Sequence, residues 1–299
     1  MENTRKKLLL SKATLLLTAI IWGGGFIFSQ IALDAGLGPA AVLLGKFGIA
    51  AVLFAAIYGR RVLRKITRRD IARGIPVGLL LAGGFFAQTY GLKYSSPSNN
   101  ALITAAYVVI TPFLWRVVNR KKPRAVIYAA SVLCLIGVAV LSVNFAGGIH
   151  LALGDMLTLL CAFLFAGQIV ATETAVSHMD TTVLLFIQFI TAAVCALIAF
   201  LITERDFTPF LNPRGLGALL FLGVLSTGLC YFMQTAAQRY VPSSSAAMLL
   251  STESLFGAAF SVAFGYDAMS LRLIVGAVLV LTSVALPDML RDRSKMTRE

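Results

Sequence analysis

Polar positions are sparse along this chain, and they separate long apolar stretches at regular intervals. A bilayer needs about 20 apolar residues for each helical span, and such stretches follow one another almost from end to end. The pattern predicts an all-α polytopic membrane protein with ten transmembrane helices. We expect these helices at about 13–33, 39–59, 74–93, 98–119, 124–143, 153–173, 181–202, 213–235, 243–264 and 270–290.

The composition agrees with a membrane protein and argues against several other classes. Charged residues make up 13% of the chain, whereas a soluble domain carries about 25%. The net charge of +13 comes from basic residues in short loops such as 60–70 and 119–124 and in the C-terminal tail, so we expect no nucleic-acid partner. Each of the four cysteines lies in a different apolar stretch. We therefore expect no disulfide, no metal site and no cofactor.

Basic loops also predict the orientation of the chain in the membrane. If the N-terminus is cytoplasmic, the loops at 60–73 and 116–124 and the C-terminal tail face the cytoplasm together with it. Cytoplasmic loops are rich in Lys and Arg, so we expect both termini to be cytoplasmic. The apolar stretch from Ala13 to Leu33 is too long for a signal peptide, and it is interpreted as a retained first span. The predicted location is the cytoplasmic membrane.

Two segments of the sequence repeat each other. "FFAQTYGLKYSSPSNNALIT" (85–104) aligns with "YFMQTAAQRYVPSSSAAMLL" (231–250), so that Gln88 matches Gln234 at an offset of 146 (234 − 88). Upstream, Lys46 matches Gln188 at an offset of 142. A repeat of five spans enters the membrane from the opposite side in its second copy. We therefore predict two inverted repeats, 1–149 and 150–299, an architecture that supports alternating access.

Four segments resemble the drug/metabolite transporter superfamily in its ten-span EamA-like branch. They are "WGGGFIFSQIAL", "GKFGIAAVLF", "NNALITAAYVVITPFL" and "SSAAMLLSTESLFGAAFSVAFGYDAMSLRLIVGAVLVL". The resemblance implies a transporter, often an exporter, of amino acids, other small metabolites or drugs. Lys46 stands where the family usually has Arg, Ser254 where it has Pro after Glu253, and Asp267 near a usual Glu. The missing proline leaves a kink in the ninth span open.

The first span contains Gly23, Gly24 and Gly25 near its middle. Helices approach closely in lipid where small residues meet, so these glycines are predicted either to allow close packing or to act as a hinge. Trp22, Phe26 and Ser29 lie at i, i+4 and i+7. They therefore share one helix face, which we expect to line a substrate cavity.

Two charged residues are expected inside spans, where ionisable groups are costly and mostly functional. Lys46 would meet a substrate carboxylate or pair with an acid, with snorkelling to the interface as the alternative. Glu253 would bind a proton, a substrate amine or Lys46, with a structural hydrogen bond as the alternative. Tyr107 aligns with Glu253 across the repeat. The remaining predicted cavity residues are amides, each with an interhelical hydrogen bond as the alternative: Gln88, Gln168, Gln188 and Gln234.

These features predict a secondary transporter that moves a small solute, an amino acid or related metabolite, outward by alternating access. A proton is the candidate coupling ion, and a monomer and a homodimer both remain open. The alternative is efflux of drugs or lipophilic cations, with Glu253 as the counter-charge. A nucleotide-sugar carrier would need several fixed cations. An enzyme is disfavoured because His150 and His178 fall on opposite faces of the membrane and no hydrolase motif is present.

Overall fold

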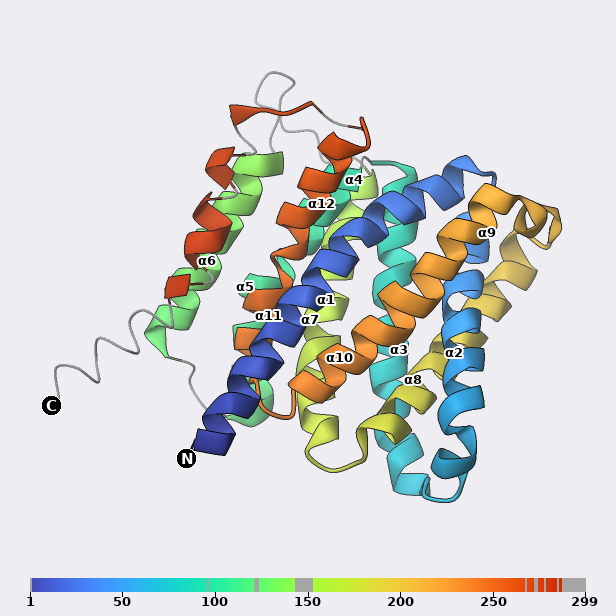
Figure 1. Ribbon diagram of the computed structural model, residues 1–299, viewed down its shortest axis with the longest axis horizontal. Coiled ribbons are helices and arrows are strands. Elements are labelled where there is room, and N and C mark those ends of the chain that lie inside the picture. Colours follow the sequence, from blue (N-terminus) through green and yellow to red (C-terminus); the bar gives the residue numbers. More distant parts are fainter. Residues whose placement is uncertain are drawn as a thin grey trace, which may run out of the picture.

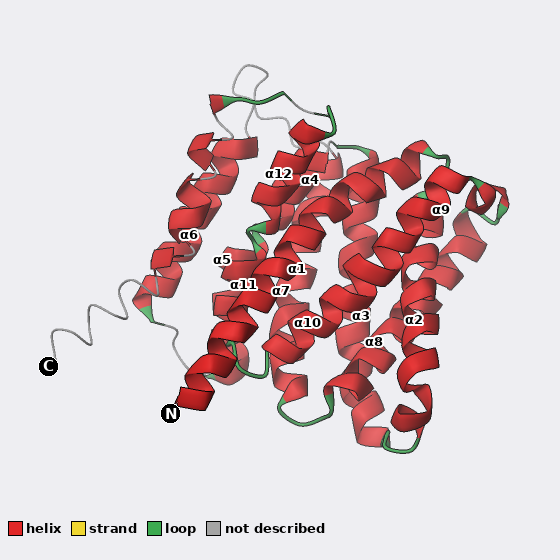
Figure 2. Cartoon of the chain, viewed as in Figure 1, coloured by secondary structure: helices red, strands yellow, loops and turns green. Residues whose placement is uncertain are grey.

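A computed structural model of the protein describes residues 2–95, 97–120, 124–142, 153–266, 268–271, 274–276, 278–283 and 285–286. Over these residues the regular structure is helical, with no strand (Figure 2). Seven helical segments are long and apolar enough to cross a membrane: Lys6–Asp34, Pro39–Leu63, Arg68–Lys93, Leu153–Val176, Thr181–Thr203, Pro213–Ala237 and Ser243–Ala263. The prediction of an all-α, multi-pass membrane protein is confirmed.

The elements follow one another along the chain with short connections (Figure 1). The first half contains α1 (Glu2–Asp34), α2 (Pro39–Leu63), α3 (Arg68–Lys93), α4 (Pro97–Thr104), α5 (Tyr107–Asn119) and α6 (Ala125–Ser142). The second half contains α7 (Leu153–Val176), α8 (Thr181–Thr203), η1 (Thr208–Leu211), α9 (Pro213–Leu220), η2 (Phe221–Leu229), α10 (Cys230–Ala237), α11 (Ser243–Leu250) and α12 (Glu253–Ala263).

Polar side chains fix where several of these helices begin. Thr67 and Asp70 form a reciprocal capping box at the start of α3. Asp180 caps α8 by accepting from the backbone N–H of Thr182 at 2.8 Å. The cap of α2 comes from another helix end, because the Glu204 carboxylate accepts from the N–H groups of Ala40 and Ala41 at 2.9 Å. Such caps satisfy backbone donors that have no partner within the helix.

Three of the ten expected spans are not among these seven segments. The fourth is divided between α4 and α5, the fifth corresponds to α6, Ala125–Ser142, and the tenth lies partly outside the described residues. The number of spans therefore stays a prediction. The expected boundary between the halves, at 149/150, and Asp267 also lie outside the described residues.

The interruptions of the fourth and ninth spans are alike in their backbone hydrogen bonds. In the fourth span, the N–H groups of Ala106 and Val108 bond three residues back, to Ile103 and Ala105. In the ninth, Thr252 and Ser254 bond in the same way to Leu249 and Ser251. The donor residues of the two spans are 146 positions apart in both cases (252 − 106 and 254 − 108). Both spans thus contain one tightened turn of 3₁₀ type at equivalent positions.

The ninth span is interrupted even though Ser254 replaces the proline of the family pattern. The hydroxyls of Ser251, Thr252 and Ser254 bond to carbonyl oxygens three residues earlier, at 2.7–2.8 Å. Such bonds compete with the backbone ladder and bend helices. The interruption that the sequence left open is therefore present, and three hydroxyl bonds accompany it.

The helices pack around a centre rich in aromatic side chains. α3 lies against α7 and α8, α2 against α8, and α1 crosses α12 and α10. Phe47, Phe85, Phe165, Phe189 and Tyr231 belong to one buried cluster. α6 lies at the edge of the bundle in Figure 1. The interrupted helices α4 and α12 contact each other and α1, which brings both interruptions to the middle of the protein.

Candidate functional site

A cavity lies at this centre, with about 590 Å³ of empty space when its opening is included. Its walls come from spans of both halves: α1, α2, α3, α4, α5, α7, η2, α10 and α12. Most of the predicted site residues line it: Trp22, Phe26, Ser29, Lys46, Gln88, Tyr107, Gln168, Gln234 and Glu253. Small-molecule sites commonly have such a lining, with apolar groups and a few polar ones.

Lys46 reaches the cavity from α2 and does not snorkel to the surface. Its side chain is 3% exposed, and Nζ lies 3.4 Å from the ring centroid of Phe85 and 5.6 Å from that of Phe47. In the described part of the chain no carboxylate forms an ion pair with it. A desolvated cation–π contact contributes about 2 kcal/mol, less than the several kcal/mol that burying a charge costs. An anionic group from a ligand would offset the remainder.

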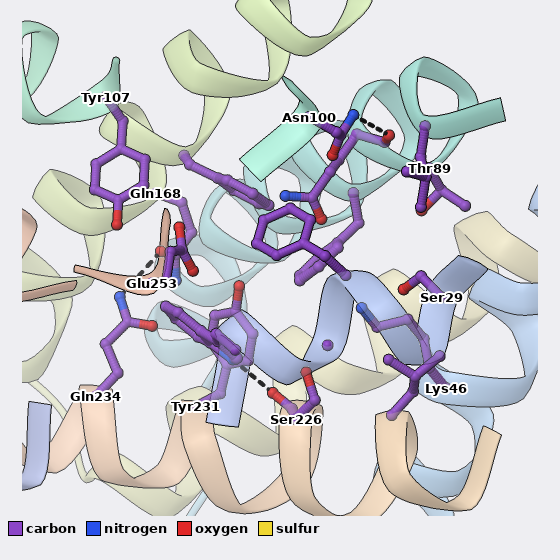
Figure 3. A pocket seen from close by; sticks show the side chains of 18 of the residues that line it. Ser29, Lys46, Thr89, Asn100, Tyr107, Gln168, Ser226, Tyr231, Gln234 and Glu253 are labelled. Carbon is purple, nitrogen blue, oxygen red and sulfur yellow. Dashed lines mark hydrogen bonds between the residues drawn. The ribbon is translucent and has the colours of Figure 1, made fainter. Parts of the chain in front are cut away.

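Glu253 is the first residue of α12 and is 5% exposed. The N-terminal end of a helix favours a negative charge. The hydroxyl of Tyr107 interacts with this carboxylate, but the contact falls outside regular hydrogen-bond geometry, so Tyr107 Oη keeps no regular partner. The pairing of Glu253 with Lys46, one of the alternatives that the sequence left open, is not formed. Figure 3 shows the two side chains at opposite ends of the pocket.

Amide side chains also line the cavity. Gln234 Nε2 donates to Gln168 Oε1 at 3.3 Å and to Gln238 Oε1 at 3.1 Å, while its own Oε1 has no partner. Asn100 likewise donates to the carbonyl of Gln88 at 3.0 Å, and its Oδ1 has no partner. Buried polar atoms are nearly always paired. Both residues line the cavity, but the two unpaired oxygens are themselves enclosed, so a donor from outside the chain would reach them only if neighbouring side chains move.

Aromatic rings separate the two charged ends. Phe85, which contacts Lys46, lies 4.9 Å from Phe165 and 6.1 Å from Tyr231 between ring centroids. Tyr231 in turn lies 5.1 Å from Trp22. The Trp22 indole donates to the carbonyl of Ser226 at 2.7 Å, within the π-helical segment η2 (Figure 3). π-helical turns free backbone carbonyls and often occur at functional sites.

The three glycines of the first span differ in what surrounds them. A Cβ added at Gly23 would lie 2.6 Å from Phe256 Cβ and 2.8 Å from the backbone nitrogen of Gly257. At Gly25 it would lie 3.1 Å from the Ser226 hydroxyl, whereas at Gly24 it would have ordinary contacts from 3.5 Å. Gly23 therefore permits the close crossing of α1 and α12, and Gly25 also lines the cavity.

Gln188 is the predicted site residue that does not line the cavity. It lies on α8 at 0% exposure, and neither atom of its amide has a partner. Sequence reasoning in turn missed Asn100, Phe85, Tyr231 and Ser226. The repeat could have revealed two of these, because Phe85 and Tyr231 occupy the first positions of the aligned segments.

The cysteines and the remaining acids have structural surroundings. All four cysteines are free thiols, and the described residues contain no cluster of side chains that could hold a metal ion. Glu173 accepts from the N–H of Ser243 at 2.8 Å and from the Trp115 indole at 2.9 Å. It therefore caps α11 and ties it to α5 and α7.

Comparison with known proteins identifies the family of this chain. The EamA-like transporter family matches residues 10–143 and again residues 152–286. The chain is a member of the EamA-like transporter family. An uncharacterized transporter of Archaeoglobus fulgidus is 29% identical over 270 residues, covering 90% of this chain and 83% of that protein. The uncharacterized transporter YcxC of Bacillus subtilis is 29% identical over 230 residues, covering 73% of each.

A solved crystal structure shares the fold. It superposes with a TM-score of 0.77 at 18% identity and covers 96% of this chain and 98% of its own. The resemblance noted in the sequence is thus confirmed at the level of family and fold. The EamA-like relatives are transporters by name, which points to transport across a membrane and away from an enzyme.

Proposed function

We propose that this protein exports a small solute that carries both an amine and a carboxylate, such as an amino acid. The observation that carries the proposal is the separation of charge within one cavity. The carboxylate of Glu253 lies at one end beside Gln234 and Tyr107, and the ammonium of Lys46 lies at the other. The aromatic rings between them suit the apolar part of such a solute. A lipophilic cation would leave Lys46 buried beside a second positive charge.

Purified protein in proteoliposomes can test this assignment by competition against a radiolabelled amino acid that the protein transports. We expect a zwitterionic solute to compete at least tenfold better than its amine-only or acid-only analogue, because hydrogen bonds to charged groups contribute about 1.5–3 kcal/mol each. Lys46→Met should weaken binding of the zwitterion and leave binding of the amine analogue unchanged. Stronger competition by tetraphenylphosphonium, retained in Lys46→Met, would instead favour the lipophilic-cation alternative.

The variant Glu253→Gln separates two roles of the acid. If Glu253 recognises the substrate amine, the variant should bind the zwitterion about tenfold or more weakly. If Glu253 carries the coupling proton, the variant should still exchange substrate but lose accumulation driven by a pH gradient. Transport with unchanged affinity and unchanged pH-gradient dependence would contradict both roles.

We further propose that the two halves are inverted repeats that exchange conformations. Three observations support this arrangement. The family matches the chain twice, the interrupted turns of the fourth and ninth spans have equivalent hydrogen bonds, and the aligned residues Gln88 and Gln234 both line the cavity. Interrupted helices at corresponding positions of two halves mark the substrate site in many secondary transporters.

A hydrogen-bond network at one end of the cavity, which we call the latch, would have to open in such a transition. It starts at the cavity residues Gln168 and Gln234 and continues outward through Glu173, Gln238 and Ser243. Gln238 Nε2 donates to the Ile169 carbonyl at 2.8 Å, and the Ser243 hydroxyl donates to the same carbonyl at 3.1 Å and to Glu173. The latch joins α7 to α10 and α11 at one end of the cavity. With the predicted orientation, this end faces the cytoplasm.

A further inference from the structure

A second hollow lies between α3, α5 and α7 and shares no lining residue with the central cavity. It contains about 930 Å³ of empty space, its opening included. α3 and α5 both pack against α7 but scarcely against each other, which leaves the space open. Its walls are largely apolar and include Pro76, Val77, Leu80, Leu114 and Val170. Of its lining residues only Arg73 and His178 have ionisable side chains.

The two ionisable residues lie at the same end of the hollow. Arg73 stands near the start of α3, and His178 follows the end of α7, which runs in the opposite direction. From His178 to Gly167 the wall covers about 16 Å, and from Arg73 to Leu80 about 10 Å, at 1.5 Å per helical residue. The hydrocarbon of one leaflet is about 15 Å thick. The apolar walls therefore match one leaflet, with the ionisable residues at its water interface.

Both polar groups are available to a ligand. The arginine side chain is exposed, and none of the hydrogen bonds or ion pairs found among the described residues uses it. The imidazole Nδ1 of His178 lies 2.9 Å from the Thr174 carbonyl and 2.7 Å from the Ser177 hydroxyl. These contacts hold the ring by Nδ1, and none of the hydrogen bonds found among the described residues uses Nε2. No carboxylate lines the hollow, so no lining residue offers Arg73 a counter-charge.

We propose that this hollow binds an anionic glycerophospholipid, with an acyl chain along the apolar walls and the phosphate at Arg73 and His178. Basic pockets between transmembrane helices recognise such head groups. A second copy of the chain is a poorer occupant, because an apolar helix face alone would leave the guanidinium without a counter-charge. The substrate of the central cavity is too small and too polar to fill walls of this length.

Native mass spectrometry of the full-length protein, titrated with phosphatidylglycerol or with phosphatidylcholine of the same acyl chains, tests the proposal. We expect phosphatidylglycerol adducts at clearly lower lipid concentration. Arg73→Gln should weaken phosphatidylglycerol binding about fivefold, the effect of one cation near an anionic head group. The control Arg64→Gln removes an equal charge from the neighbouring loop, outside the lining of the hollow, and should have little effect.

A second variant fills the apolar walls and leaves the charges in place. Ala171 lines the hollow, and Ala171→Phe should reduce phosphatidylglycerol adducts although Arg73 is unchanged. Equal binding of the two lipids, or equal effects of Arg73→Gln and Arg64→Gln, would overturn the proposal. So would a dimer of the unmodified protein that Ala171→Phe dissociates, because the occupant would then be a second copy. None of these results bears on the central cavity, so the transport proposal is tested separately.

Discussion

Gly23 offers a sharp test of how α1 and α12 hold the cavity together. The substitution Gly23→Ala places a Cβ 2.6 Å from Phe256 Cβ and 2.8 Å from the backbone nitrogen of Gly257. Carbon atoms pack at about 3.5–4 Å, so the two helices would have to separate by about 1 Å. Neither opposing atom belongs to a flexible side-chain end that could rotate away.

The expected cost can be worked out against the gain in helix propensity. Overpacking costs about 1–3 kcal/mol, and replacing glycine by alanine in a helix returns about 1 kcal/mol. We therefore expect Gly23→Ala to lose up to about 2 kcal/mol of stability. Gly24→Ala gains the same propensity without a close contact, since its Cβ would lie 3.5 Å from the Phe221 ring. It should be neutral or stabilising, which makes it a matched control.

The assay is thermal unfolding in detergent together with exchange transport in proteoliposomes. Gly23→Ala should lower the melting temperature by a few degrees, at about 2–4 °C per kcal/mol. It should also impair exchange, because Gly257 packs against Phe26 of the cavity wall. If Gly23→Ala and Gly24→Ala behave alike in both measurements, the close crossing of α1 and α12 is not what these glycines provide.

Two further substitutions probe groups outside the cavity. Gln188→Leu removes two buried polar atoms without partners, so we expect a gain in stability of up to about 1–3 kcal/mol, measured as a higher melting temperature. If transport falls at the same time, Gln188 serves the alternate conformation. An unchanged melting temperature and unchanged transport would contradict the view that this amide is unsatisfied. Glu173→Ala removes the cap of α11 and the hydrogen-bond acceptor of the Trp115 indole. We therefore expect a loss of about 1–2 kcal/mol of stability, measured as a lower melting temperature. Asp34→Ala is the control, because Asp34 caps no other helix, and it should change the melting temperature much less.

Much of the candidate site follows from the sequence because membrane burial makes polar residues conspicuous. Lys46 and Glu253 stand out inside apolar stretches, and the stripe of Trp22, Phe26 and Ser29 follows from helical periodicity. Each of these side chains lines the cavity. The periodicity could not place Ser226, because it lies in a π-helical segment whose turn is wider than the assumed 3.6 residues.

Gln188 marks the limit of reasoning from the repeat. Alignment with Lys46 gives it an equivalent position in the second half, but equivalent positions have the same surroundings only when the two halves have the same conformation. Lys46 has a cavity in front of it, whereas Gln188 is fully enclosed. An aligned position therefore does not by itself identify a cavity residue.

The ninth span shows why a missing motif residue need not remove a structural feature. Proline interrupts a helix by removing a donor and by steric clash. Here three hydroxyl groups weaken the same turn by bonding to its carbonyls, while the fourth span reaches the equivalent hydrogen bonds through Ala105 and Ala106 without hydroxyl side chains. Different residues thus produce the same tightened turn at matching positions. Each turn is followed directly by a cavity residue, Tyr107 in the fourth span and Glu253 in the ninth. The two segments differ in helix propensity, so propensity does not explain why both helices are interrupted at the same aligned position. The need to hold a polar side chain in the cavity wall explains it better.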